Sequence, residues 1–416
     1  MAANGNDNWK SEKLADICAQ ITDGKHGDCQ DEPDSGFYFL SCKDVANGKL
    51  NYDGARQITE ADFLDTHRRT KFSPSDVLIT NSGTIGRMAI APDNELTRRT
   101  TFQKSVAILK PITSHVEPNF LYYALQSDIR RLIEFAGGTA QMNLLLRDLR
   151  AFEVKVPPLP VQRRIAGILS AYDELMENSQ RRIRLLEAMA RALYREWFVH
   201  FHFPGHEKHQ RVASPLGDIP QGWEVLPIST IANIVLGGTP SRSINEYWYG
   251  GTIPWLKSGK LNDLRVIEGS ELITARGFEM SATKLMPPKT VLVAITGAIL
   301  ISFLEIEACA NQSVIGIYET KKVCPEYLHI YLSENISLFE SKMSGSAQQH
   351  INKDIVEQTL VLVPHEKPGY AFRLFVQPLY EEIALLLFKI QNLRRTRDLL
   401  LPRLLSGQVH QIKTEP

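Results

Sequence analysis

VQRRIAGILSAYDELMENSQRRIRLLEAMARALYREWF, residues 161–198, is the longest uninterrupted helical pattern in the chain. Apolar or small residues recur there at intervals that mostly alternate between four and three, which is the spacing of a coiled-coil seam. Two consecutive intervals of four around Ser179 predict a stutter, where a supercoil locally unwinds. At about 1.5 Å per residue the helix would be on the order of 55 Å long, so we expect a partner for its apolar face. The seam residues are Val161, Ile165, Ile168, Tyr172, Leu175, Ser179, Ile183, Leu186, Ala190, Leu193 and Trp197.

A second stretch near the C-terminus has the same spacing and is the expected partner helix. Arg397 occupies one position of its seam. Pro378 and Pro402 lie inside the pattern, and a proline removes a helical hydrogen bond. We therefore predict a kink or restart near Pro378 and fraying at Pro402. The apolar seam residues are Phe372, Leu379, Ile383, Leu386, Ile390, Leu393, Leu400 and Leu404.

The composition is that of an ordinary globular protein. The chain has 416 residues, of which 43% are hydrophobic, and this length predicts two or three domains. Its 47 basic and 47 acidic residues give a net charge of zero, which argues against binding polyanions by bulk attraction alone. The N-terminal MAANGNDNWK lacks the apolar segment of a signal peptide. Five cysteines without a CxxC pair are typical of reduced thiols in a cytosolic protein.

The sequence on the two sides of the first helix repeats. Residues 9–158 and 223–364 are two diverged copies of one module, and the period is far too long for a solenoid repeat. The matched segments are 9–17 with 223–231, FLSCK (39–43) with WLKSG (255–259), VLITNSG (77–83) with VLVAITG (291–297), QKSV (103–106) with NQSV (311–314), 120–125 with 327–332, and GTAQ (138–141) with GSAQ (345–348).

Each module mixes short β-branched runs with one amphipathic helix, as at residues 118–135, and this predicts two α+β domains. The longest apolar run, residues 291–304, is shorter than the about 20 residues of a membrane-spanning helix. We interpret it as buried strands. The predicted boundaries are 1–158 for the first module, 159–203 for the first helix, 204–364 for the second module, 365–408 for the second helix and 409–416 for a tail.

The chain has no recognisable catalytic motif. Neither a P-loop GxxxxGK[ST] nor the Asn-Pro-Pro-aromatic tetrapeptide of methyltransferases occurs. Asp148, Glu153 and Lys155 could form a nuclease-like set around a divalent metal, but the second copy keeps only the aspartate. A solvated strand edge is therefore favoured. A cluster of four histidines lacks the cysteine or carboxylate ligands of a tetrahedral metal site, so a linker is favoured there. These histidines are His200, His202, His206 and His209.

Polar turns that recur in both modules are candidates for contact with DNA. One turn follows a buried strand, at residues 81–86 and 296–298, and another precedes the last strand, at 138–143 and 345–350. Side-chain amides pair in two-point fashion with adenine, whereas lysine and arginine suit guanine and phosphate. Ordinary turns also use these residues. The candidate DNA-binding residues are Lys25, Lys43, Arg68, Arg69, Asn81, Ser82, Thr84, Gln141, Asn143, Lys257, Ser258, Lys260, Thr296, Gln348, Gln349 and His350.

Four segments, taken with the duplication, resemble a known family. They are IPQGWEV (219–225), VPPLPVQRRI (156–165), REWF (195–198) with FPGHE (203–207), and RDLLLPRLLSG (397–407). In their order along the chain they are similar to the specificity subunit of type I restriction-modification enzymes. The resemblance implies two target-recognition domains, each reading one half of a split double-stranded DNA sequence, held apart by two long helices that form an antiparallel coiled coil.

The resemblance also implies partners for a chain that is itself non-catalytic and cytoplasmic. Two modification subunits would dock on the helices, and restriction subunits would join to add translocation and cleavage. S-adenosylmethionine, ATP and magnesium would be bound by these partners, with no cofactor or metal on this chain. The candidate docking residues are Arg163, Arg164, Arg181, Arg182, Arg394 and Arg395. A freestanding DNA-modifying enzyme and a coiled-coil scaffold without a DNA role are the competing hypotheses.

Overall fold

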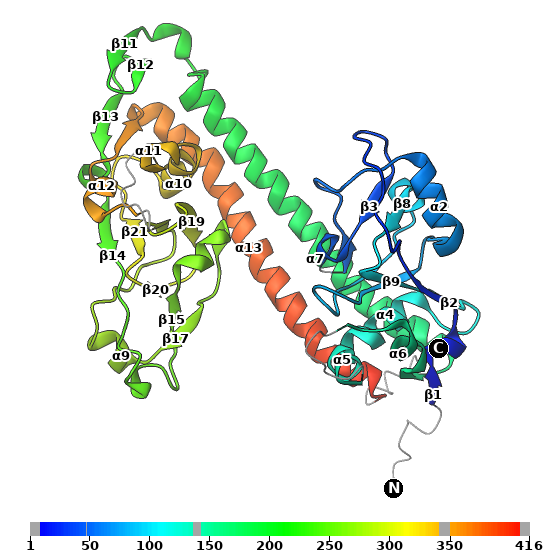
Figure 1. The fold of residues 1–416 in the computed structure, drawn as a ribbon. Helices are drawn as coiled ribbons and strands as arrows, with labels where there is room; N and C mark the ends of the chain where they lie inside the picture. The colour runs from blue at the N-terminus through cyan, green and yellow to red at the C-terminus, as the bar shows by residue number, and fades with distance from the viewer. Residues whose placement is uncertain (1–8, 47, 136–142, 341–349, 408–416) are drawn as a thin grey trace, which may run out of the picture. The chain divides into compact units, whose positions relative to one another are not determined.

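The structure is a computed structural model that describes residues 9–46, 48–135, 143–340 and 350–407 (Figure 1). The chain divides into two compact units. Unit 1 comprises residues 1–176 and 392–416, and unit 2 comprises residues 177–391. Two long helices, α7 (Leu159–Tyr194) and α13 (Glu366–Leu405), contribute residues to both units. No helix among the described residues is long and apolar enough to cross a membrane.

Unit 1 is built around a four-stranded antiparallel sheet with the strand order β2-β9-β6-β7. The apolar run VLIT forms β6, which is buried along its whole length between β9 and β7. The predicted helix at 118–135 is two helices, because the chain turns at Asp128. The sheet strands are β2 (Cys18–Asp23), β6 (Val77–Thr80), β7 (Met88–Ile90) and β9 (Val106–Pro111). Around them lie β1 (Lys10–Lys13), β3 (Tyr38–Leu40), β4 (Val45–Ala46), β5 (Lys49–Leu50), β8 (Thr100–Phe102), β10 (Glu153–Val156), α1 (Leu14–Ile17), α2 (Glu60–Thr70), α3 (Glu95–Arg98), α4 (Pro118–Ser127), α5 (Ile129–Phe135) and α6 (Leu146–Ala151).

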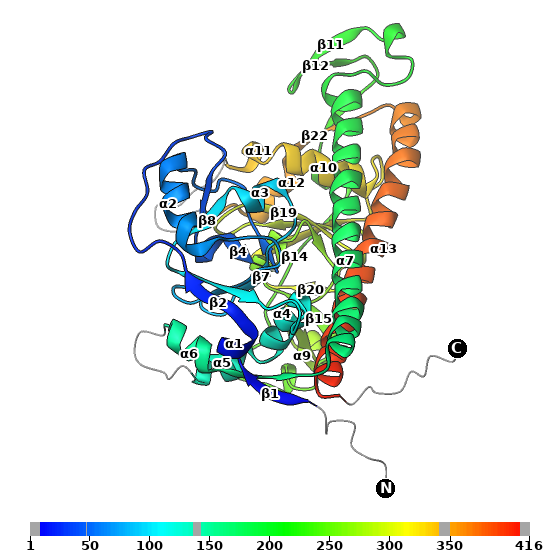
Figure 2. The ribbon, with the colours of Figure 1, turned by 90° about the vertical axis from the view of Figure 1, so that its right-hand side faces the viewer.

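The core of unit 1 includes side chains from both long helices. Phe120 of α4, Leu169 of α7 and Leu404 of α13 are buried in one cluster. Further along α7, Asp173 forms an ion pair with Arg397 of α13. Rising residue numbers on α7 thus meet falling numbers on α13, so the two helices are antiparallel within this unit, as they are drawn in Figure 2.

Unit 2 has a five-stranded sheet with the order β14-β21-β18-β19-β16. The apolar run at 291–304 forms β18 and β19, as predicted. The sheet strands are β14 (Asn233–Leu236), β16 (Arg265–Val266), β18 (Val291–Ala294), β19 (Leu300–Leu304) and β21 (Val314–Tyr318). The other elements are β11 (Arg211–Ser214), β12 (Gly217–Pro220), β13 (Glu224–Pro227), β15 (Ile253–Leu256), β17 (Glu271–Ile273), β20 (Cys309–Ala310), β22 (Leu360–Val363), α8 (Ile228–Ile231), α9 (Ala275–Glu279), α10 (Pro325–Glu334), α11 (Ser337–Glu340) and α12 (Lys353–Glu357).

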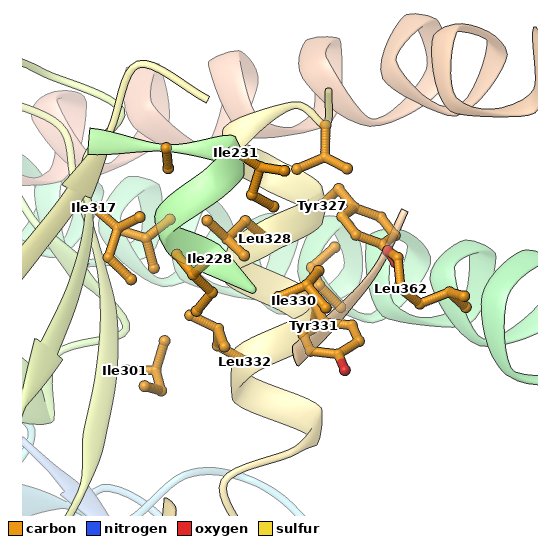
Figure 3. Packing of buried hydrophobic residues seen from close by; sticks show 14 of the residues in the cluster. Ile228, Ile231, Ile301, Ile317, Tyr327, Leu328, Ile330, Tyr331, Leu332 and Leu362 are labelled. Carbon is orange, nitrogen blue, oxygen red and sulfur yellow. The ribbon is translucent and has the colours of Figure 1, made fainter. Parts of the chain in front are cut away.

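The main core of unit 2 packs α8 and α10 against one face of this sheet. Figure 3 shows Ile228 of α8 and Leu328 of α10 beside Ile317 of β21, and all three are fully buried. The long helices complete this core as well. Trp197, in the π-helical turn Arg195–Val199 that continues α7, has its ring 6.0 Å from that of Phe372 on α13. The pairing of a late residue of α7 with an early residue of α13 is again antiparallel.

The predicted duplication is confirmed in the backbone. The order β2-β9-β6-β7 of unit 1 corresponds to β14-β21-β18-β19 of unit 2. The pair β1–β10 corresponds to β13–β22, both antiparallel, and the parallel pair β3–β8 corresponds to β15–β20. Each copy therefore reproduces the same sheet, and each ends in a strand that leads into a long helix.

The buried positions of α7 depart from the predicted seam, most clearly beside Leu175. Leu175 is 45% exposed, whereas Met176 is 7% exposed and occupies the buried position. With Met176 in the seam, the two consecutive intervals of four run from Ile168 through Tyr172 to Met176, so the predicted stutter lies around Tyr172 and not around Ser179. Because Leu175 and Met176 are adjacent and both apolar, the sequence pattern does not indicate which of them is buried.

Helix α13 runs through both of its predicted interruptions. It is continuous from Glu366 to Leu405, so the predicted restart at Pro378 and fraying at Pro402 are wrong. Pro378 leaves the carbonyl of Leu374, four residues earlier, without its helical donor. Because Leu374 is exposed, water can bind this carbonyl, and the break in the hydrogen-bond ladder costs little.

Two equivalent glycines lie where strands come into close contact with a neighbouring backbone. A Cβ atom on Gly24, after β2, would lie 1.9 Å from the carbonyl oxygen of Phe102. On Gly237, after β14, it would lie 2.2 Å from the carbonyl oxygen of Asn311. Real Cβ atoms do not come so close to backbone, so the duplicated fold requires glycine at both positions.

We predict that Gly24→Ala and Gly237→Ala each lower the free energy of unfolding by at least about 1–3 kcal/mol, because the backbone must move to admit a methyl group. Gly27→Ala and Gly259→Ala are matched controls, since a Cβ at either position meets nothing within 4 Å. Thermal denaturation of the four variants measures the effect. Equal midpoints for a variant and its control would contradict the close approach.

Candidate nucleic-acid interface

Polar turns of unit 1 meet at one edge of its sheet. The turn after β2 is held there by a hydrogen bond from the Lys104 amide to the Lys25 carbonyl, at 3.0 Å. The turn after β6 begins at Asn81, whose amide donates to the Ser105 carbonyl at 3.0 Å. Both bonds anchor these turns to the segment that leads into β9. Lys25, Asn81 and Lys104 are therefore neighbours, although they are far apart in sequence.

Two further segments join this edge. The amide of Cys42, in the 3-10 turn Cys42–Asp44 after β3, donates to the Ser105 hydroxyl at 3.1 Å, and Lys43 is exposed beside it. The amide of Leu144 donates to the Asn81 carbonyl at 2.9 Å, which places the exposed Asn143 next to the turn that contains Ser82 and Thr84. The structure thus brings most of the predicted residues of the first module together. Gln141 lies outside the described residues.

We name this set the unit 1 turn cluster and define it as residues 24–25, 42–43, 81–84, 104–105 and 143–144. One of its side-chain atoms lacks a partner. Asn81 is buried, and its Oδ1 atom has no hydrogen-bond partner within the described part of the chain. Buried polar atoms are nearly always paired, but this unpaired oxygen has almost no accessible surface, so in this conformation the predicted DNA contact of Asn81 is not open to a base.

Unit 2 repeats the arrangement with the same backbone hydrogen bonds. The Ile295 amide donates to the Ser313 carbonyl at 2.9 Å, and the Ile351 amide donates to the Ile295 carbonyl at 3.1 Å. These bonds correspond to those of Asn81 with Ser105 and of Leu144 with Asn81. The unit 2 turn cluster is accordingly residues 237–238, 257–260, 295–298, 312–313 and 350–351.

The predicted residues of the second module lie in this cluster. Thr296 and His350 face each other in an isolated β-bridge, and His350 is exposed. Lys257, Ser258 and Lys260 belong to the segment that follows β15, where the 3-10 turn Ser258–Asn262 begins. Gln348 and Gln349 lie outside the described residues.

The sequence analysis missed one residue in each cluster. Lys104 in unit 1 and Gln312 in unit 2 are exposed in equivalent positions just before the central strand. The hydroxyl of Thr239 donates to Gln312 Oε1 at 2.5 Å. The matching segments QKSV and NQSV could have indicated these positions, because a long polar residue precedes the shared serine in both copies.

Three of the predicted basic residues of unit 1 are paired with carboxylates. Lys25 Nζ lies 2.6 Å from Asp62, Arg69 lies 3.1 Å from Asp23, and Arg68 lies 3.5 Å from Asp65. They line an open hollow of about 560 Å³ together with His26, Asp65 and Thr66. Local charge is therefore largely balanced here, in agreement with the zero net charge of the chain.

The basic residues of unit 2 are paired in the same way. Lys260 lies 3.1 Å from Asp263 and 3.2 Å from Glu268. Lys257 and Arg242 share Glu271, and Arg242 also stacks 3.5 Å above the ring of Trp248. Hydrogen bonds from Arg242 and Lys257 lower the pKa of Glu271 to about 2. These pairs hold the cationic side chains in fixed positions on the surface.

The predicted docking arginines are all exposed on the long helices. Arg182 of α7 forms an ion pair with Glu382 of α13 at 2.7 Å, and Arg181 approaches Glu177 at 3.7 Å. A second feature was missed, because it lies off the seam. Large apolar side chains are exposed on both helices, and in unit 2 they are Leu185, Met189, Tyr370, Leu374, Phe375 and Leu385.

Within the described residues, no group of three or more His, Cys, Asp and Glu side chains could hold a metal ion. The rings of His200 and His202 are 6.0 Å apart, and His202 pairs with Glu196. Of the three residues that could have formed a nuclease-like metal site, Asp148 lies on α6, whereas Glu153 and Lys155 lie on the exposed face of β10. Glu153 accepts a hydrogen bond from Ser11.

The lowered pKa of Glu271 gives a pH prediction. Its folded pKa lies below the ordinary 4.5, so its ionised form stabilises unit 2 above about pH 4.5, and this contribution disappears as the pH falls toward 2. Glu271→Gln should therefore be less stable than the parent at neutral pH, by under about 1 kcal/mol for this exposed pair, and the difference should shrink in acid. Urea denaturation from pH 7 to about pH 3 measures it, with the exposed Glu279→Gln as control. A difference that is constant with pH would contradict the assignment.

Comparison with known proteins places the chain in a family. Residues 6–188 and 220–369 match the family described as Type I restriction modification DNA specificity domain. The MjaIX specificity subunit of Methanocaldococcus jannaschii is 26% identical over 89% of this chain and 86% of its own length. The HindI specificity subunit of Haemophilus influenzae is 21% identical over 96% of this chain and 99% of its own length.

A solved structure shares the fold. The S subunit of a type I restriction-modification system from M. genitalium aligns with a TM-score of 0.64 at 16% identity, over 97% of this chain and 98% of the other. The two family matches cover the two copies of the duplicated module. The chain therefore belongs to the type I restriction-modification DNA specificity family, as a non-catalytic specificity subunit with two target-recognition domains.

Proposed function

We propose that each unit binds one half of a bipartite double-stranded DNA target through its turn cluster. One observation carries the proposal: both clusters are built on the same backbone hydrogen bonds, yet they present different side chains. Asn81 of unit 1 is replaced by Ile295 in unit 2, and Asn143 by His350. A shared frame with different polar groups suits two modules that read different sequences in the same way.

The two kinds of residue in the clusters have different roles in this proposal. Asn143 and His350, both exposed, contact base edges, where hydrogen bonds distinguish base pairs. The cationic residues contact phosphates, which fix the position of the protein without reading sequence. These cationic residues are Lys25, Lys43, Arg68, Arg69, Lys104, Lys257 and Lys260. Ser82, Thr84, Ser258, Thr296, Gln141, Gln348 and Gln349 complete the proposed contact set.

The long helices are proposed to set the distance between the half-sites and to bind the partner subunits. On this proposal the first recognition domain is residues 1–158 and the second is residues 204–364, with helices at 159–203 and 365–408 and a tail at 409–416. Two modification subunits dock on the helices, and restriction subunits join through the complex. S-adenosylmethionine, ATP and magnesium belong to these partners, and the complex works in the cytoplasm.

Exposed side chains support the docking surface. Leu185 and Met189 are spaced by four residues on α7 and share a face of the helix, near the exposed arginines Arg181 and Arg182. Large exposed apolar side chains mark protein interfaces more reliably than exposed charges do. The arginines then lie at the rim, where they would select acidic groups on the partner.

The first test separates the two halves of the target. Asn143→Ala should relax base preference in one half-site and His350→Ala in the other, each by about 1–3 kcal/mol of discrimination. Methylation mapping in cells that contain the modification subunits and one variant at a time gives both half-sites in one measurement. Asn51→Ala, at an exposed asparagine of unit 1 outside the cluster, is the control. A variant that changes both halves, or neither, would overturn the assignment of one cluster to each half.

The second test concerns the docking surface. Leu185→Asp combined with Met189→Asp should weaken assembly with the modification subunits at least tenfold, because two charges enter a buried apolar contact. Asn178→Asp places a new charge on an exposed position of the same helix and should assemble normally. Size-exclusion chromatography with light scattering measures the complex. Normal assembly of the double variant would show that the partners dock elsewhere.

A further inference from the structure

A charged residue interrupts the apolar seam of α13 in unit 1. Arg397 lies between Leu393 and Leu400 in the seam, and its side chain is only 19% exposed. Its Nη1 atom lies 2.5 Å from Oδ1 of Asp173 on the facing helix α7. The guanidinium also contacts the adjacent Asp398, at 2.8 Å. The seam therefore contains a matched pair of charges that span the two helices.

A third element uses the same carboxylate. The hydroxyl of Tyr123, on α4, donates to Oδ2 of Asp173 at 2.6 Å. Tyr123 is buried, and burial raises its pKa, so the hydroxyl stays protonated and remains a donor. Asp173 thus accepts from α13 through one oxygen and from α4 through the other. The side chain of Asp173 therefore connects α7 both to α13 and to α4 of the recognition module.

This pair discriminates between helix registers in a way that the apolar seam does not. A shift of α13 by one heptad would place Leu404 or Ile390 opposite Asp173, since these residues lie seven positions on either side of Arg397. Leucines and isoleucines would again meet apolar partners. The arginine, however, would lose Asp173 of the facing helix in a mostly buried seam and keep only Asp398 of its own helix. A single polar position in a coiled coil specifies register for this reason, even where it adds little stability.

We propose that the ion pair between Asp173 and Arg397, with Asp173 held in place by Tyr123, fixes the register of the helix pair and thereby a single spacing between the two half-sites. We call these three residues the register key. The three are positioning residues, and none of them needs to touch DNA. The proposal rests on the proposed function for its DNA consequence, but the register itself can be measured without DNA. In the absence of the key, a heptad shift would move the helices by roughly 10 Å, equivalent to a spacer change of up to about three base pairs.

The first experiment maps the register by disulfide formation in the full chain. Ile168→Cys with Leu401→Cys reports the native register, because both side chains are partly buried and pack against the same apolar cluster. Ile168→Cys with Arg394→Cys reports the register shifted by one heptad. With the key intact, we expect only the native disulfide. With Asp173→Leu and Arg397→Leu added, the shifted disulfide should become a major product. Its continued absence would overturn the proposal.

The second experiment uses the spacing of methylated sites. Cells with the parent chain should contain one spacer length, and cells with the Asp173→Leu, Arg397→Leu double variant should contain additional lengths at unchanged half-sites. A merely structural role predicts a changed melting temperature with one spacer retained, and that result would contradict the proposal. Arg403→Leu, at an exposed arginine of α13 in the same unit, is the matched control.

Two safeguards keep the outcomes distinct. Asp173→Leu alone removes the only carboxylate that the facing helix offers to Arg397 and should lower the melting temperature. The double variant, in which both charged side chains are replaced by apolar ones, is therefore the informative one. If the parent chain gives no split target, the proposed function fails, and the disulfide measurement still decides whether the pair sets the register.

Discussion

Each unit is completed by side chains from both long helices, and the rest of the structure depends on this sharing. Leu404 of α13 is buried in unit 1 with Leu169 of α7, and Trp197 of α7 is buried in unit 2 with Phe372 of α13. Truncation of one such side chain to alanine costs about 2–5 kcal/mol. Neither recognition module would keep its core without the helix that follows the other module. The helix pair is therefore part of the core of each unit.

The two turn clusters combine a shared backbone frame with side chains that differ between the copies. The frame consists of backbone hydrogen bonds, such as those of the Asn81 and Ile295 amides, and these do not depend on side-chain identity. Side chains on the turns can therefore diverge without loss of the fold, as they have between the two copies of this chain. The same logic explains why the cationic residues are held in ion pairs. Because the charge is balanced, we expect the isolated chain to bind polyanions weakly and the assembled complex to bind DNA tightly.

Sequence periodicity predicted the two helices, the duplication and the α+β modules, because these depend on local patterns of apolar residues. It assigned Leu175 to the seam, although Met176 is the buried residue. Both side chains are apolar, so periodicity alone could not distinguish them, and the packing of the folded chain decides which one is buried. It predicted a kink or restart near Pro378, but α13 is continuous there, and Leu374, four residues earlier, is exposed. The recurring turns identified both clusters. The pairing of Lys25 with Asp62, however, joins residues far apart in sequence, and no local pattern contains that information.

The central claim is that two equivalent modules on a shared helix pair read two separate half-sites. Mapping of methylated bases across DNA from cells that contain this chain and its modification subunits tests the claim most directly. The account predicts a split motif in which two short specific sequences flank a spacer of one fixed length. A contiguous motif, or a split motif recognised equally well at many spacer lengths, would contradict it.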